Sequence, residues 1–93
     1  MIKSFKCHET QKIWNGFFST KLPGDIQEVA RRKLRMINNA KQLSDLLIPP
    51  NNRFEALKGE RRGEYSIRIN KQWRICFCWE DGYASCIAIE DYH

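Results

Sequence analysis

The pattern of apolar and polar positions divides the chain near residue 64. Beyond Glu64, apolar and polar residues alternate, as they do in half-buried strands. Three such runs are expected, at residues 64–69, 73–79 and 84–90. Because short turns separate them, this half of the chain is predicted to form an antiparallel sheet.

The first half of the chain instead repeats its apolar residues every three or four positions, which indicates amphipathic helices. Thr10 is expected to cap a first helix that begins at Gln11, and a second is expected from Asp25 to about Leu43. The apolar stripe of the first helix is predicted to be Ile13, Trp14, Phe17 and Phe18.

Two further segments complete the expected fold. Residues 2–6 are predicted to form a short strand with Ile2 and Phe5 on opposite faces, and Pro49-Pro50 marks a loop. Leu46, Leu47 and Ile48 are expected to anchor this loop to the core. The predicted class is α+β, with two N-terminal helices packed on one face of a mainly antiparallel sheet, in one domain over residues 1–93.

The strand register decides where the arginines lie. A three-residue loop at residues 70–72 sets Arg68 opposite Arg74, whereas a two-residue loop would mix the apolar and polar faces. Two guanidinium groups in this position suit a phosphate between them. In the next hairpin, a loop at residues 81–83 sets Glu90 opposite Arg74 and Phe77 opposite Ile87. A surface ion pair of Arg74 with Glu90 is the alternative to an anion site.

The charge distribution favours a polyanionic partner. The net charge is +5, and residues 53–74 hold seven basic against three acidic groups, whereas residues 75–93 hold none against four. A cluster of cations in the second predicted helix is either a solvated face or a contact with RNA or an acidic partner. It comprises Arg31, Arg32, Lys33 and Arg35.

Other features narrow the class of protein. No apolar run approaches the roughly 20 residues of a membrane span, and no secretory signal is apparent, so we expect a soluble cytoplasmic protein with no membrane partner. The four cysteines lack the spacing of zinc ligands and are expected to be small buried hydrophobes. Neither a metal nor a cofactor is expected.

No activated serine or cysteine nucleophile and no glycine-rich phosphate loop is apparent. The residues that do gather near the predicted arginine face suit metal-independent RNA cleavage, in which a 2′-hydroxyl attacks its own phosphate. They are Lys58, Arg68, Arg74, Tyr92 and His93, with Glu55, Glu90 and Asp91 nearby.

Four motifs resemble the HigB toxins of the RelE superfamily. They are Phe54-Glu-Ala-Leu-Lys-Gly59, Tyr65-Ser-Ile-Arg-Ile-Asn70, Trp73-Arg-Ile-Cys-Phe77 and Glu90-Asp-Tyr-His93. The resemblance implies a RelE-like fold and a toxin of a type II toxin–antitoxin module that cleaves mRNA on the translating ribosome. It also implies a HigA-type helix-turn-helix antitoxin as partner, and operator DNA indirectly through that antitoxin.

Carried over by motif, the resemblance assigns mRNA binding or cleavage to Lys58, Arg68, Arg74, Tyr92 and His93, with Asp91 in support. Some relatives have a histidine where this chain has Glu55, so the general base is either His93 or Glu55. Further RNA contacts are expected from Arg53, Arg61, Arg62 and Lys71. The alternative to an enzyme is a basic module that binds RNA or a partner without cleaving anything.

Overall fold

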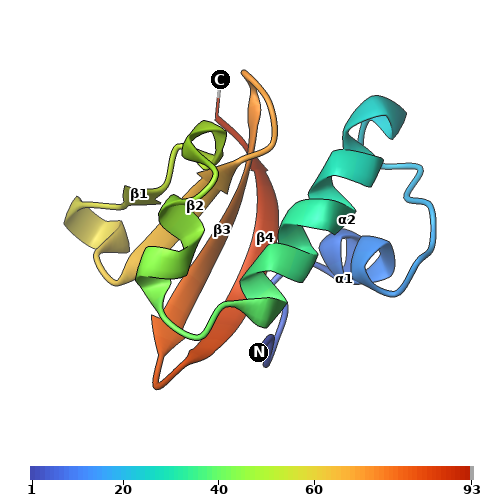
Figure 1. Ribbon diagram of the computed structural model, residues 1–93. Coiled ribbons are helices and arrows are strands. Elements are labelled where there is room, and N and C mark those ends of the chain that lie inside the picture. The colour runs from blue at the N-terminus through green and yellow to red at the C-terminus, as the bar shows by residue number, and fades with distance from the viewer. Residues whose placement is uncertain (93) are drawn as a thin grey trace.

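The computed structural model describes residues 1–92 and contains two α-helices and a four-stranded antiparallel sheet. The helices are α1 (His8–Trp14) and α2 (Gly24–Asn39). The strands lie in the order β1 (Glu55–Ala56), β2 (Glu64–Arg68), β3 (Trp73–Glu80) and β4 (Tyr83–Asp91). Both helices lie on the same side of the sheet (Figure 1), which confirms the predicted α+β class. None of the described helices has the length and apolarity needed to cross a membrane.

The core lies between α2 and one face of the sheet. Alternate residues of the strands pack against the apolar residues that recur every three or four positions along α2. Each fully buried aliphatic side chain contributes about 1.5–3 kcal/mol by leaving water. The central buried residues are Ile26, Ala30, Leu34 and Ile37 of α2 and Ile67, Ile75, Phe77, Ile87 and Ile89 of the sheet. The opposite face of the sheet is therefore left for polar side chains.

The register of the β2–β3 hairpin confirms the prediction. Arg68 pairs with Arg74, and the apolar pair Ile67 and Ile75 lies next to it on the other face. A one-residue slip would have exchanged the two faces, so burial of the isoleucines fixes the position of the arginines.

The β3–β4 hairpin differs from the prediction at its turn. Asp81 and Gly82 both have positive φ, 52° and 82°, and form a two-residue turn that sets Glu80 against Tyr83. A bulge at Cys86, where φ is 51°, inserts one extra residue into β4. The predicted three-residue loop is therefore wrong, and Phe77 lies opposite the bulge, where the register gives it no single partner. The bulge restores the predicted register beyond it, so Glu90 lies opposite Arg74.

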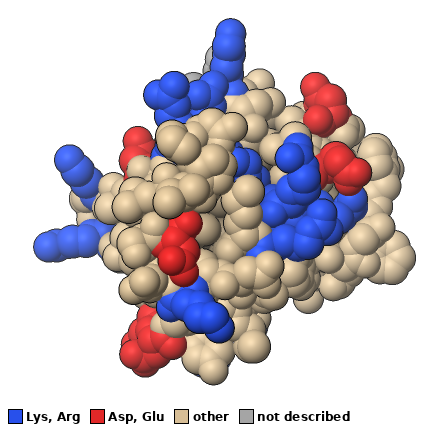
Figure 2. Space-filling view, in the orientation of Figure 1, with Lys and Arg blue, Asp and Glu red and all other residues tan. Residues whose placement is uncertain are grey.

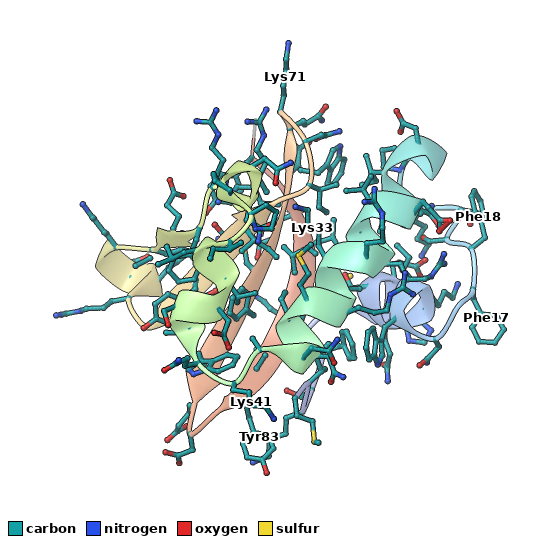
Figure 3. The ribbon with its side chains drawn as sticks, in the orientation of Figure 1. Phe17, Phe18, Lys33, Lys41, Lys71 and Tyr83 are labelled. Atoms are coloured by element: carbon teal, nitrogen blue, oxygen red, sulfur yellow. The ribbon has the colours of Figure 1, made fainter. Side chains whose placement is uncertain are left out.

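The N-terminal helix also differs from the prediction. It begins at His8, and Thr10 is buried within it, where the Thr10 hydroxyl accepts a hydrogen bond of 2.9 Å from the Ile89 amide. Because the helix ends at Trp14, Phe17 and Phe18 are 64% and 66% exposed and project from the connection to α2 (Figure 3). The predicted cap at Thr10 and the last turn of the apolar stripe are therefore wrong.

Helix α2 is shorter than predicted, and no side chain caps its start. It begins at Gly24 after Pro23 and ends at Asn39, so Asp25 lies inside the first turn. The N-terminal segment before α1 lies beside strand β4, where Ile2 and Phe5 form isolated parallel bridges. Both side chains pack against the core, which corrects the prediction that they lie on opposite faces.

The segment between α2 and β1 is anchored by a buried polar residue. It contains two 3-10 turns, η1 (Leu43–Leu47) and η2 (Pro50–Asn52). Leu46 is buried, but Leu47 and Ile48 are exposed, contrary to prediction. Asn52 is fully buried instead, where it accepts a hydrogen bond from the Lys33 ammonium and donates one of 3.1 Å to the Leu46 carbonyl.

Candidate active site

A basic hollow lies on the sheet face opposite the helices, at the end where β2 turns into β3. Its volume is about 310 Å³, and no acidic residue lines it within residues 1–92. Its lining residues are Arg53, Arg68, Asn70, Lys71, Arg74 and Tyr92. Lys71 projects from the hairpin tip (Figure 3). Four cations without a carboxylate among them favour binding of an anion.

Arg74 is held in place by neutral oxygen atoms. Its Nε donates to the Ser66 hydroxyl at 2.8 Å, and its Nη2 donates to the Ser66 carbonyl at 3.3 Å and to the Arg53 carbonyl. No ion pair involves Arg74 or Arg68 within residues 1–92. The guanidinium of Arg74 is thereby fixed in orientation while its positive charge stays uncompensated.

Glu90 lies opposite Arg74 in the ladder but binds another arginine. The Glu90 carboxylate accepts two hydrogen bonds of 2.8 Å from Arg61, which also donates at 2.8 Å and 3.3 Å to Glu64. These carboxylates raise the pKa of Arg61, Glu90 most, and the hydrogen bonds from Arg61 lower the pKa of Glu64. The alternative of a surface ion pair between Arg74 and Glu90 is therefore wrong.

Tyr92 closes the hollow at the C-terminal end of the sheet. Its amide donates to the Gln72 carbonyl at 2.6 Å, and Arg74 lies 5.6 Å from the centre of its ring, within range of a cation–π contact. Burial raises the pKa of the Tyr92 phenol, and so do the neighbouring Cys76 and the negative charge of Glu55. Burial likewise raises the pKa of Cys76 to about 11. Both groups stay protonated near neutral pH, so neither is suited to act as a base or nucleophile.

Glu55 lies on the same face of the sheet as Arg74. It pairs with Ser66 across β1 and β2, so its side chain shares the face on which Ser66 contacts Arg74. Its charge also acts on Tyr92. Three carboxylates were predicted near the site, and two of them, Glu55 and Glu90, lie on the arginine face. Glu55 is the one of these two that Arg61 does not bind.

The structure does not bring the other predicted residues into the hollow. Asp91 pairs with Trp73, which faces the core, and accepts a hydrogen bond of 3.0 Å from Gln72. Lys58 and Arg62 flank the 3-10 turn η3 (Gly59–Arg61); both are exposed, and neither lines the hollow. His93 lies outside the described residues.

Two residues of the site were missed by sequence reasoning. Ser66 is fully buried and orients Arg74, and its place two residues before Arg68 on one strand face was the available signal. The Asn70 side chain accepts hydrogen bonds from the amides of Gln72 and Trp73, which is typical of an Asx turn. That turn fixes the hairpin tip on which Lys71 is carried.

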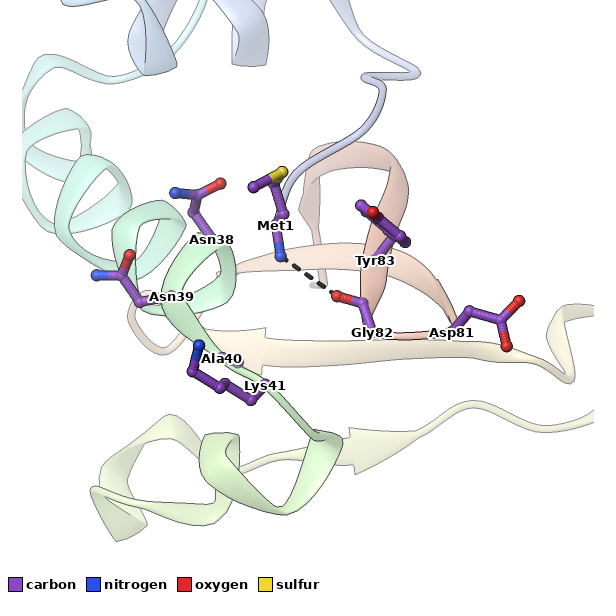
Figure 4. Close-up of a pocket in the computed structure, with 8 residues that line it drawn as sticks. All are labelled: Met1, Asn38, Asn39, Ala40, Lys41, Asp81, Gly82 and Tyr83. Atoms are coloured by element: carbon purple, nitrogen blue, oxygen red, sulfur yellow. Dashed lines mark hydrogen bonds between the residues drawn. The ribbon is translucent and has the colours of Figure 1, made fainter.

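The remaining features of the molecule offer less chemistry. A larger hollow of about 460 Å³ lies between the end of α2 and the β3–β4 turn, where the Met1 amine donates to the Gly82 carbonyl at 3.3 Å (Figure 4). Of the four cysteines, only Cys76 is buried, so the prediction of four buried thiols is wrong. Within residues 1–92, no three His, Cys, Asp or Glu side chains are grouped as metal ligands would be.

The fold is shared with other small proteins of known structure. YoeB from Staphylococcus aureus, solved in complex with YefM, matches all of this chain and 98% of its own, with a TM-score of 0.63 and 20% identity. YafQ from Escherichia coli matches 97% of this chain and 94% of its own, with a TM-score of 0.59 and 13% identity. At these identities the likeness defines the fold alone.

The sequence assigns the particular family. The profile of HigB-like toxins, described as RelE-like toxins of the type II toxin–antitoxin system HigB, matches residues 3–93, and the chain belongs to this family. Toxin HigB-1 of Vibrio cholerae is 49% identical over 63 residues, which are 68% of this chain and 66% of that toxin. Endoribonuclease HigB of Proteus vulgaris is 31% identical over the full length of both chains.

Proposed function

We propose that this HigB-family toxin is an endoribonuclease that cleaves mRNA on the translating ribosome in the cytoplasm. The observation that carries the proposal is the state of Arg74, whose guanidinium is oriented by neutral oxygens beside Arg68 in a hollow without acidic residues. Such donors stabilise charge that develops during reaction, because they need no reorganisation when it appears. The relative from Proteus vulgaris named Endoribonuclease HigB supports the assignment.

The proposed reaction is an internal transesterification. The 2′-oxygen of one nucleotide bonds to phosphorus while the bond from phosphorus to the 5′-oxygen breaks, which leaves a 2′,3′-cyclic phosphate and a 5′-hydroxyl. One proton leaves the 2′-hydroxyl and one reaches the 5′-oxygen, so the step consumes no cofactor. Arg68, and Arg74 through the Nη1 that Ser66 and Arg53 do not bind, stabilise the extra negative charge on the phosphorane, because hydrogen bonds from a guanidinium to phosphate oxygens are strong.

Two residues are proposed to accept the proton of the 2′-hydroxyl. Glu55, on the arginine face, and His93 are the candidate bases. Lys58 is proposed to bind the phosphate together with the two arginines. Tyr92, kept neutral by its raised pKa, stacks on a base. A pH–rate profile of Glu55→Gln and His93→Gln distinguishes the two bases, because loss of the true base removes the acidic limb of the profile.

The proposed partner is a HigA-type helix-turn-helix antitoxin, through which the toxin reaches operator DNA indirectly. Membership in a family of toxin–antitoxin toxins supports an antitoxin as the partner. Arg53 and Lys71, which line the hollow, are proposed to contact the mRNA backbone, and Arg62 to extend that contact at the exposed turn η3.

Mapping of RNA 5′ ends tests the proposal. Purified toxin is mixed with mRNA and programmed ribosomes, and primer extension is expected to reveal new 5′ ends that disappear when ribosomes are omitted or the cognate antitoxin is added. Arg74→Ala is expected to abolish these ends, whereas Arg35→Ala, an exposed arginine of α2, retains them. Translation arrest without new ends would instead support a basic module that binds without cleaving.

A further inference from the structure

A second basic hollow adjoins the first. It has a volume of about 350 Å³ and lies between α2, the 3-10 turn η2 and the end of β2. Helix α2 contributes Arg32 and Lys33 to it, and η2 contributes Asn51. Arg68 and Asn70 line both hollows, so the two are continuous around these side chains.

The short length of β1 leaves the edge of β2 beside Arg68 unpaired by a strand within residues 1–92. Strand β1 pairs only with Tyr65 and Ser66 of β2, so within residues 1–92 no strand lies beside Arg68 on that edge. Arg68 therefore stands at the rim of the sheet, between the hollow around Arg74 and the hollow against α2. An extended polymer can pass from one to the other around this edge.

The charges of the second hollow have the same sign as those of the first. Within residues 1–92 no acidic residue lines it, and neither Arg32 nor Lys33 takes part in an ion pair. Lys33 is only 7% exposed, and its ammonium donates to the Asn52 side chain. Burial first, and then the positive charge of Arg32, lower the pKa of Lys33. An anion bound here would offset both effects.

The figures place this charge on the helix-covered side of the molecule. Lysine and arginine side chains gather over α2 in Figure 2, and Figure 3 shows Lys33 between α2 and the sheet. Arg31 of the same helix is already engaged, because it donates to Glu28 at 3.1 Å and to the Ile13 carbonyl at 2.9 Å. The uncompensated cations of α2 that reach the hollow are thus Arg32 and Lys33.

We propose that the second hollow is a subsite for an RNA backbone phosphate, bound by Arg32 and Arg68 as the chain continues from the phosphate held at Arg74. The inference rests on the proposed function, since it extends the same site along the RNA. RNA fits better than an acidic protein segment because the hollow is continuous with the first one and the polar amides of Asn51 and Asn70 can bind ribose or base edges.

Binding of uncleavable RNA to the full-length toxin tests this subsite. A 2′-O-methyl dinucleotide reaches only the hollow at Arg74, whereas a 2′-O-methyl hexamer spans both. In fluorescence anisotropy at low salt, Arg32→Ala is expected to weaken the hexamer about three- to fivefold and leave the dinucleotide unchanged. The slope of log K against log salt for the hexamer is expected to fall by about 0.7, the loss of one phosphate contact.

Two variants separate charge from folding. Arg32→Lys is expected to recover most of the affinity, because it keeps the charge. Arg35→Ala, which removes an exposed arginine of the same helix outside both hollows, is expected to bind like the wild type. Because the RNA is not cleaved, the result is independent of whether Arg74 is catalytic.

The source of the phosphate is decided in a second arm with ribosomes that carry no mRNA. Weaker binding of Arg32→Ala to the hexamer supports the proposed subsite for the substrate strand. Weaker binding only to empty ribosomes would assign the hollow to ribosomal RNA and overturn the continuation of the substrate strand from Arg74. The proposal is overturned if both affinities equal those of Arg35→Ala. It is also overturned if the loss is confined to the antitoxin, which would make the hollow a site for an acidic protein.

Discussion

Two arginines on one face of the sheet have opposite surroundings. Arg61 is surrounded by carboxylates, with four hydrogen bonds to Glu64 and Glu90. Arg74 is surrounded by a hydroxyl and carbonyl oxygens, and no carboxylate binds it within residues 1–92. Both side chains are fixed, but only the charge of Arg74 is left to act on a ligand. The nature of the partners, more than their number, separates a structural arginine from one suited to bind phosphate.

The contrast also explains why Glu90 does not neutralise Arg74. Strand pairing sets Glu90 opposite Arg74, yet the turn η3 carries Arg61 back over the sheet, where it takes both oxygens of that carboxylate. Arg61 thereby removes from the hollow an anion that would compete with RNA. Its proposed role in binding RNA is thus indirect, by occupying Glu90, whereas Arg53 and Lys71 line the hollow themselves.

The largest effect is expected from Arg74→Ala. Loss of an oriented donor to the phosphorane is expected to reduce the cleavage rate about 10²- to 10³-fold, measured as single-turnover cleavage of mRNA on programmed ribosomes. Arg74→Lys keeps the charge but not the planar fork and is expected to recover only part of the rate. Cleavage by Arg74→Ala at the wild-type rate would show that Arg74 does not stabilise the transition state.

Arg61→Ala is expected to act on stability first. It removes the clamp between Glu64 and Glu90, and because these side chains are a quarter to a third exposed, the expected loss in free energy of unfolding is about 1–2 kcal/mol in urea denaturation. The matched control is Arg62→Ala, an exposed neighbour in the chain, expected within about 0.5 kcal/mol of the wild type. Equal stability of the two variants would contradict the structural role of Arg61.

A smaller effect is expected from Ser66→Ala. It removes the hydroxyl that accepts from Arg74 Nε but leaves the carbonyl contacts, so Arg74 stays near the hollow with a looser orientation. We expect about a tenfold loss in cleavage rate with little change in RNA affinity, because orientation matters most in the transition state. An unchanged rate would mean that the backbone contacts alone position Arg74.

The smallest expected effect is on the pH dependence of stability. Arg61 lowers the pKa of Glu64 below its ordinary 4.5 in the folded protein, so this contribution is present above pH 4.5 and is lost as pH falls through the lower folded pKa. The difference in unfolding free energy between wild type and Arg61→Ala should therefore shrink below pH 4.5, by less than about 1 kcal/mol. Parallel pH curves for the two proteins would argue against a contribution from this pair.

Several predictions failed where a residue's surroundings come from distant parts of the chain. Phe17 and Phe18 have helical spacing, but α1 ends at Trp14 and leaves both exposed. Lys33 lies in a run of basic residues that is typical of a solvated helix face, yet its ammonium is buried and donates a hydrogen bond to Asn52, 19 residues away. The apolar pattern carries no signal for either outcome, because a helix end and a buried polar pair depend on neighbours that come from other elements.

The sequence by itself determined the class of fold and the pairing of Arg68 with Arg74, because the period of a strand is two and burial of Ile67 and Ile75 permits only one register. Only the tertiary structure decided which arginine keeps its charge. That outcome depends on η3 folding back so that Arg61 reaches Glu90, 29 residues further along, and on Ser66 and Arg53 offering neutral oxygens to Arg74. Periodicity specifies which face a side chain is on, whereas its partners on that face are set by how distant segments pack.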